Sequence, residues 1–74
     1  MSAATTKQIE IVVNGQARLV PAGCTLQELL VWLDVDPARV ALELNREIVQ
    51  RQAWGQTTVG LGATLEIVQF VGGG

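Results

Sequence analysis

The sequence contains no histidine and a single cysteine, Cys24. Without histidine, the chain lacks the common zinc ligand sets, the cysteine–histidine pair and the serine–histidine–acid arrangement of nucleophilic catalysis. A single cysteine cannot form an intramolecular disulfide, and no charged leader with an apolar run precedes the first predicted strand. These absences argue against catalysis by this chain alone, and they favour a reducing, cytoplasmic location.

Charged residues are also scarce, at 16% of the chain, and the five basic residues are scattered through a sequence of net charge −2. Scattered basic residues form no stripe that could follow a nucleic acid backbone. No apolar run is long enough to span a membrane. The 74 residues, 49% of them hydrophobic, suffice for one core but leave no room for a second. We therefore expect one domain over residues 1–74 that binds neither nucleic acid nor membrane.

The first third of the chain shows the alternation of a β-hairpin. Apolar residues recur at every second position from Ile9 to Val13, as in a strand with one buried face. The dipeptide Asn14-Gly15 is favoured in two-residue hairpin turns, because both positions tolerate positive φ. An antiparallel second strand is predicted to follow, in which Ala17, Leu19 and Pro21 alternate with Arg18 and Val20.

A helix is predicted next. Thr25 and Glu28 have the spacing of a capping box, in which each side chain bonds the backbone N–H of the other residue. Asp36-Pro37 is expected to close the segment, because the residue before proline disfavours helix. The apolar stripe at helical spacing consists of Leu26, Leu29, Leu30 and Leu33, with Trp32 at its margin.

The second half of the chain predicts further strands. Residues 40–44 alternate as a strand, and residues 45–49 turn the chain into a short partner strand. A short helical turn is expected near residues 51–54, and residues 64–70 form the last strand, rich in β-branched residues.

Together these elements predict an α+β fold, a mixed sheet of four to five strands packed on one main helix. In so short a chain the β-grasp (ubiquitin-like) topology is the natural closed solution, with the first and last strands parallel at the sheet centre. Periodicity itself indicates only a helix and about four strands, so this pairing is a hypothesis.

The last strand continues directly into Val71, Gly72, Gly73 and Gly74. Ordering glycine is costly, at roughly 1 to 2 kcal/mol of backbone entropy per residue, so we expect residues 71–74 to form a flexible tail. Without Cβ atoms, such a tail can thread a narrow channel and present the Gly74 carboxylate inside another protein. The alternative is ordinary terminal fraying. A glycine-rich phosphate loop with its lysine is absent, so any ATP site must belong to a partner.

Several segments occur in an order that resembles one protein family over nearly the whole chain. The family is the ThiS family of sulfur carrier proteins of thiamine biosynthesis. Ala63 departs from the pattern, because the family more often has aspartate there. The matching segments are residues 11–15, 25–30, 40–45 and 48–51, Trp54, and residues 65–74.

The resemblance implies a protein cosubstrate rather than an enzyme. An E1-like adenylyltransferase of the ThiF type would adenylate the Gly74 carboxylate with ATP and magnesium, and the carrier itself would bind no cofactor and no metal. Sulfur from cysteine, supplied through a cysteine desulfurase, would then replace AMP to give a thiocarboxylate. Thiazole synthase of the ThiG type would receive that sulfur for the thiazole moiety of thiamine. Gly72 and Gly73 would let the tail thread into each partner.

Docking candidates lie beside the tail. Leu65 and Ile67 are predicted to face the core, whereas Val68 and Phe70 face away and, with Val71, would dock a partner. The alternative is that a bulge or the helix covers Val68 and Phe70. Elsewhere, we expect Trp54 at the core edge and Cys24 as a small passive side chain, although a low-pKa thiolate near the helix start is conceivable.

Two other functions stay open. A related carrier for molybdopterin, cysteine or tRNA thiolation would share the fold and tail. Thiamine ranks first because the tail lacks the proline pair common before the glycines of molybdopterin carriers, and because five residues resemble that family's middle segment. These are Asn45, Ile48, Val49, Arg51 and Trp54. From another class, a pure interaction module would use a sheet edge or apolar patch and form no acyl adenylate.

Overall fold

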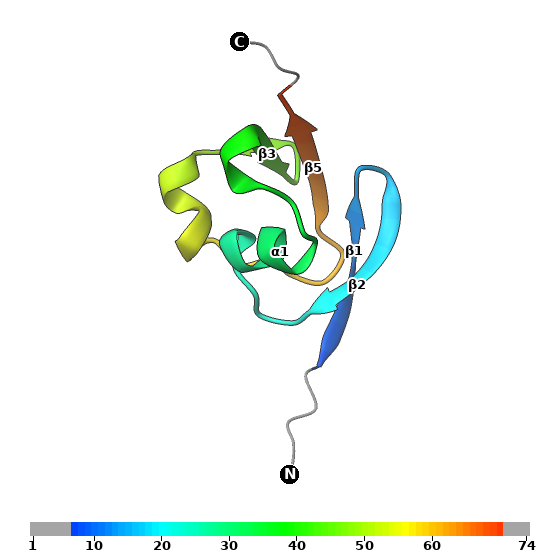
Figure 1. The fold of residues 1–74 in the computed structure, drawn as a ribbon. Helices are drawn as coiled ribbons and strands as arrows, with labels where there is room; N and C mark the ends of the chain where they lie inside the picture. Colours follow the sequence, from blue (N-terminus) through cyan, green and yellow to red (C-terminus); the bar gives the residue numbers. More distant parts are fainter. Residues whose placement is uncertain (1–6, 71–74) are drawn as a thin grey trace.

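The computed structural model describes residues 7–70 (Figure 1). The predicted tail, Val71 to Gly74, lies outside the described residues, so its role and the extent of one domain over residues 1–74 remain predictions. In chain order the elements are β1 (Gln8–Val13), β2 (Gln16–Pro21), α1 (Leu26–Trp32), the 3₁₀ helix η1 (Pro37–Arg39), β3 (Val40–Leu44), β4 (Glu47–Val49), the 3₁₀ helix η2 (Arg51–Gln56) and β5 (Thr64–Gln69).

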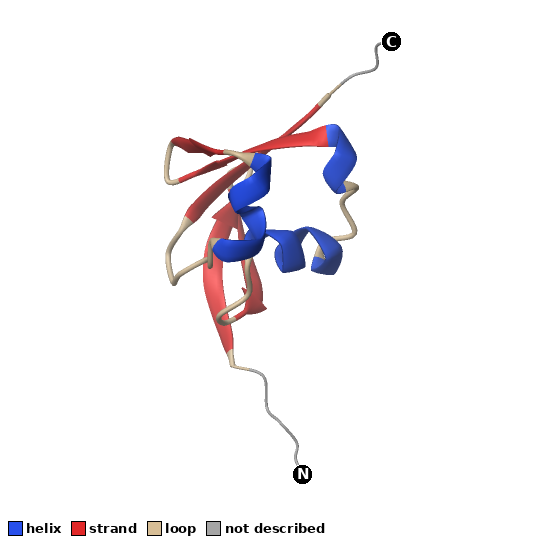
Figure 2. Ribbon diagram, turned by 90° about the vertical axis from the view of Figure 1, so that its left-hand side faces the viewer, coloured by secondary structure: helices blue, strands red, loops and turns tan. Residues whose placement is uncertain are grey.

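The strands form a single mixed sheet of order β2-β1-β5-β3-β4. β1 and β5 are parallel neighbours, and the other pairs are antiparallel. Figure 2 shows the helical segments on one side of this sheet. The predicted β-grasp is therefore confirmed, with five strands and with the first and last side by side.

Both hairpins turn through two residues with positive φ. Asn14 and Gly15 have φ values of 49° and 83°, so the turn predicted from this dipeptide is confirmed. Asn45 and Arg46 have φ values of 53° and 71° in the second hairpin. Positive φ at both central positions matches the twist of the flanking strands. Asparagine adopts this left-handed conformation more readily than most residues other than glycine, because its short polar side chain can form local hydrogen bonds.

The register of the first hairpin determines which residues of β2 are buried. Ile9 pairs with Val20, and Ile11 pairs with Arg18. Directly opposed residues share a face of the sheet, so Val20 lies on the core side and is fully buried. Leu19 is 56% exposed on the other face. The alternating pattern therefore predicted the strand β2 correctly. The face that carries Ala17, Leu19 and Pro21 is not the buried one, however, because Val20 lies on the core side.

The start of α1 follows the predicted capping box. The Glu28 backbone N–H donates to Thr25 Oγ1 at 3.1 Å, and the Thr25 N–H donates to Glu28 Oε1 at 2.9 Å. These reciprocal bonds satisfy two N–H groups that the first helical turn would leave unpaired. The local sequence thus determines where the helix begins.

The predicted end of the helix at Asp36-Pro37 is wrong, because α1 ends at Trp32. Asp34 adopts a left-handed conformation, φ 62°, and its N–H donates to the Val31 carbonyl at 3.0 Å. The Val35 N–H donates to the Leu30 carbonyl at 2.9 Å. This pair of bonds is a Schellman motif with aspartate in glycine's place, and Val35 packs against the core behind it.

The core lies between the inner face of the sheet and the helical segments. Leu26, Leu29 and Leu30 of the predicted stripe are fully buried, whereas Leu33 is partly buried. Trp54 in η2, expected at the core edge, is also buried, and its Nε1–H donates to the Val49 carbonyl at 3.0 Å. Within residues 7–70, no helix is both long and apolar enough to cross a membrane.

Candidate functional site

The strand that leads into the glycines is β5. It lies between β1 and β3 in the middle of the sheet, and Figure 1 shows it running toward the C-terminal end of the chain. Its position matters because β5 is the last described element before the glycines. The contacts of Thr64 to Phe70 therefore define the base of the candidate site.

Asn45, in the second hairpin turn, holds the start of β5. Its backbone N–H donates to the Thr64 carbonyl at 2.7 Å, and its Oδ1 accepts the Thr64 N–H at 2.9 Å. One residue thus satisfies both backbone groups of Thr64. The strand is held in register from its first residue.

Asn14, in the first hairpin turn, holds the middle of β5. Its Oδ1 accepts the Ile67 N–H at 2.7 Å, and its Nδ2 donates to the Ile67 carbonyl at 3.3 Å. The side-chain amide therefore replaces a strand peptide where β1 has already turned away. The sequence predicted Asn14 as a turn residue within a segment that resembles the family, and gave it no contact with the last strand. An asparagine in a hairpin turn that is also expected beside a parallel strand is the signal that could have indicated this second role.

The last backbone hydrogen bond of the described chain joins β5 to η1. The Phe70 N–H donates to the Arg39 carbonyl at 2.8 Å. Asp36 caps η1 by accepting the Ala38 N–H at 3.0 Å, and its carboxylate lies 3.8 Å from Arg39 Nε. Phe70 is thus the point at which the described sheet ends, one residue before Val71.

Arg51 supports the segment that holds Phe70. Its guanidinium lies over the Trp54 ring, 4.7 Å from the ring centroid, and donates to the carbonyls of Pro37 and Val40, the latter at 3.3 Å. These two carbonyls flank Arg39. The sequence placed Arg51 in a short helical turn and in a segment that resembles the family, but it did not indicate these contacts, because they join segments that are distant in sequence.

The two faces of β5 have different surroundings. Leu65 is fully buried and Ile67 partly buried, as predicted. Val68 is 53% exposed and Phe70 is 54% exposed. Neither a bulge nor the helix covers Val68 and Phe70, so the alternative interpretation is wrong. Their proposed docking role remains a prediction, and Val71 lies outside the described residues.

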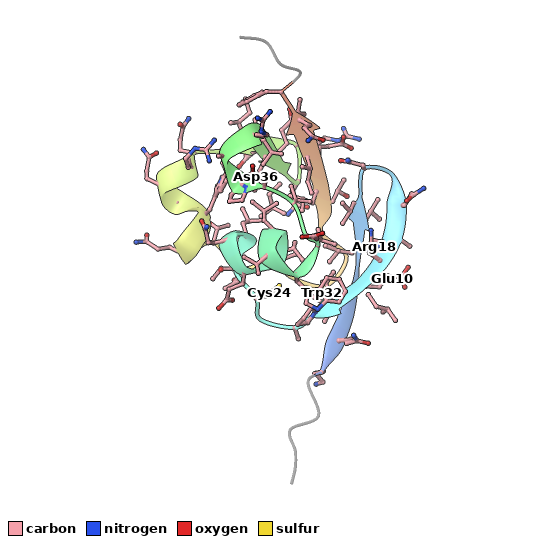
Figure 3. All side chains as sticks on the ribbon, in the orientation of Figure 1. Glu10, Arg18, Cys24, Trp32 and Asp36 are labelled. Atoms are coloured by element: carbon pink, nitrogen blue, oxygen red, sulfur yellow. The ribbon has the colours of Figure 1, made fainter. Side chains whose placement is uncertain are left out.

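Cys24 lies just before α1 and is buried. Figure 3 shows it beneath the start of the helix. Burial raises the pKa of the Cys24 thiol, and the nearby Glu28 carboxylate raises this pKa further, while a backbone hydrogen bond opposes the shift. A buried thiol with a raised pKa is a poor nucleophile. The geometry therefore favours the passive role over a reactive thiolate.

The described residues offer little chemistry of their own. Within residues 7–70, histidine, cysteine, aspartate and glutamate form no group of three that could hold a metal ion. What the structure does provide is a strand clamped on both sides up to Phe70, with exposed apolar side chains on its outer face. This arrangement suits the presentation of a chain segment to another protein.

Comparison with known proteins agrees with this description. The sulfur carrier protein ThiS of Escherichia coli K12 is 39% identical over 66 residues, which cover 89% of this chain and 100% of that protein. A thiazole synthase of Paramagnetospirillum magneticum is 44% identical over 66 residues, 89% of this chain. The chain spans 20% of the length of that synthase.

A solved structure shows the same architecture. The crystal structure of the thiamine biosynthesis protein ThiS from Geobacter metallireducens superposes with a TM-score of 0.79 at 36% identity, covering 89% of this chain and 100% of that one. The model of the ThiS family matches residues 6–74. This match, together with a relative aligned over its whole length, shows that the chain belongs to the ThiS family.

Proposed function

We propose that this chain is a sulfur carrier protein of thiamine biosynthesis that works through the carboxylate of Gly74. The observation that carries the proposal is the family match, which extends over residues 6–74 and so includes the glycines. The whole-length E. coli relative is itself named a sulfur carrier protein. In this role the chain is a cosubstrate that other enzymes modify, rather than a catalyst.

Activation requires a partner. A carboxylate is a poor acyl donor until a better leaving group replaces one of its oxygens. We propose that an E1-like adenylyltransferase of the ThiF type uses ATP and magnesium to convert the Gly74 carboxylate to an acyl adenylate. Sulfur that a cysteine desulfurase takes from cysteine is carried as a persulfide, whose terminal sulfur attacks the adenylate and releases AMP. A thiol then reduces the resulting acyl disulfide, which leaves a thiocarboxylate at Gly74. In this proposal ATP, magnesium and the desulfurase act with the partner, and the cycle runs in the cytoplasm.

The chain's own contribution is presentation. The bonds from Asn14 and Arg39 hold β5 up to Phe70, so only the following residues need to enter the partner. Gly72 and Gly73 lack Cβ atoms and can pass a channel too narrow for other residues. Val68 and Phe70 are exposed close to the last described residue and would dock the partner together with Val71.

Thiazole synthase is the proposed sulfur acceptor. One fifth of the P. magneticum thiazole synthase is similar to this chain, so that synthase contains a segment that resembles a carrier. Two activities within one protein commonly act in sequence. This supports thiazole synthase of the ThiG type as the partner, ahead of enzymes that use sulfur for molybdopterin, cysteine or tRNA.

Intact mass spectrometry tests the proposal. The chain is incubated with the activating enzyme, ATP, magnesium and a sulfur donor, with the E. coli carrier as positive control. We expect the mass gain of one oxygen-to-sulfur exchange, localised to Gly74 by fragmentation. A chain without Gly73 and Gly74 should fold normally and gain nothing. If the E. coli carrier is charged and this chain is not, the proposal is wrong.

The same deletion separates a carrier from a pure interaction module. A module that binds through its folded surface alone would keep its whole effect on the partner without the two glycines. A carrier would lose sulfur transfer completely while its circular dichroism spectrum stayed unchanged. Restoration of thiazole formation by the full chain, and not by the shortened one, is the expected result.

A further inference from the structure

The outer face of the sheet carries an apolar patch that none of the helical segments covers. Ile48 on β4 is 70% exposed, and Val68 and Phe70 are more than half exposed. Ala41 on β3 lies directly opposite Val68. We call these four residues the open-face patch. Of these, Ala41 and Val68 adjoin across strands, and exposed apolar residues gathered on one face mark a candidate docking surface.

Two glutamates lie within this surface. Glu43 on β3 is directly opposite Glu66 on β5, and Ile48 is opposite Glu43 on its other side. Opposed residues in such a ladder have Cα atoms roughly 5 Å apart, so the two carboxylates point outward side by side. Like charges in this position destabilise a sheet.

No cation within the described residues neutralises this pair. Across residues 7–70, the only ion pair joins Arg39 to Asp36, and Arg51 is occupied over Trp54. Arg18 lies on the β1–β2 hairpin, as Figure 3 shows, and pairs in register with Ile11 on the inner face. The free domain therefore leaves two neighbouring carboxylates without a cationic partner, with Ile48 on one side and Ala41 and Val68 next along the strands.

We propose that the open-face patch docks a surface of the adenylating partner on which an arginine or lysine is flanked by apolar residues. The cation lies between Glu43 and Glu66, and the apolar residues cover Ile48 and Val68. Charge complementarity selects this occupant, because an apolar surface without a cation would bury two carboxylates unpaired. Arginine suits the position best, since its planar fork can bond both carboxylates.

This inference rests on the proposed function in one respect, namely that the partner is the protein that adenylates Gly74. If the two glutamates only faced solvent, neutralising them would not weaken the binding of a partner. Because like charges directly opposed in a sheet are destabilising, we expect the Glu43–Glu66 pair to lower the stability of the free domain, and the partner's cation to relieve this on binding. Neutralising both side chains should therefore stabilise the carrier and weaken the complex.

The test compares the double variant Glu43→Gln/Glu66→Gln with the wild-type full chain. Thermal unfolding gives the stability of the free carrier, and calorimetry without ATP gives its affinity for the adenylating partner. We expect a higher Tm together with a Kd weaker by roughly tenfold or more, and a smaller loss of affinity with added salt. The higher Tm also shows that the variant folds.

Glu10→Gln/Glu47→Gln is the matched control, because it changes the net charge equally at exposed glutamates outside the patch. Figure 3 shows Glu10 on the β1–β2 hairpin. An equal loss of affinity in the control would overturn the proposal, since net charge alone would then explain it. Unchanged affinity in the Glu43/Glu66 variant would also overturn it.

The result is separable from that of the proposed function. Affinity is measured without ATP and does not depend on whether Gly74 becomes charged with sulfur. Tight, charge-dependent binding without any mass gain at Gly74 would contradict the sulfur-carrier role and leave the docking surface intact. Sulfur loading at Gly74 together with an affinity that does not depend on Glu43 and Glu66 would contradict the docking surface and leave the sulfur-carrier role intact.

Discussion

The two faces of β5 place successive residues of one strand in opposite surroundings. On the inner face, Leu65 is buried within the core that Ile11 and the leucines of α1 also form. On the outer face, Val68 is exposed and no helical segment lies over it. Because side chains alternate along a strand, one short segment can supply stability with one set of residues and recognition with the other. Substitutions on the two faces should therefore separate folding from partner binding.

The largest effect on stability is expected from the inner face. Leu65→Ala removes a fully buried side chain from the centre of the sheet, so the free energy of unfolding should fall by about 2 to 5 kcal/mol. Urea denaturation measures this loss. Leu65→Val provides a milder variant that should remain folded and lose less. A loss below about 1 kcal/mol for the alanine variant would show that β5 is not packed as described.

The next effect concerns the contacts that hold the end of β5. Arg51→Met should lower the free energy of unfolding by roughly 1 to 3 kcal/mol, because it removes the bonds to the Pro37 and Val40 carbonyls and the contact with Trp54. Hydrogen exchange at the Phe70 amide should accelerate. Arg18→Met, at an exposed site, is the control. Equal protection of Phe70 in both variants would exclude a role for Arg51 at this end of the strand.

A smaller effect is expected from the side-chain amide of Asn14. Asn14→Gly keeps the left-handed turn but removes both side-chain bonds to Ile67, so stability should fall by about 1 kcal/mol. Exchange of the Ile67 amide should accelerate more than exchange of Thr64. If both amides respond alike, the substitution has loosened the whole sheet and Asn14 has no local role.

The smallest effect on stability belongs to the outer face. Val68→Ala should change the free energy of unfolding by no more than about 0.5 kcal/mol, because the side chain is more than half exposed. The affinity of this variant for the proposed adenylating partner should nevertheless weaken, which calorimetry detects. A variant with reduced stability and unchanged affinity would contradict the division of roles between the two faces.

Local sequence signals predicted most of the fold. The alternation in β1, the Asn14-Gly15 turn and the capping box at Thr25 each depend on neighbouring residues, so each was readable from the sequence. The end of α1 was not. Asp34 takes up the left-handed conformation four residues after the buried Leu30, and Val35 then packs on the core. The packing of Val35 depends on the rest of the domain, so the position of Pro37 in the sequence could not indicate it.

The candidate site divides in the same way. The glycines, the family resemblance and the outward direction of Val68 and Phe70 were available from the sequence, since they depend on residue type and on the period of a strand. The clamp between Asn14 and Ile67, the support from Arg51 and the pairing of Glu43 with Glu66 were not. Each joins residues from different elements.

Amino-acid sequence alone therefore determined which elements this protein forms, the apolar faces of β1, α1 and β5, and the glycine segment that follows β5. Only the tertiary structure decided which strands became neighbours, where α1 stopped and which carboxylates came to lie side by side. The physical reason is the range of the interactions involved. Turns, caps and alternation act over a few residues, whereas register and packing depend on contacts between segments as far apart as Asn14 and Ile67.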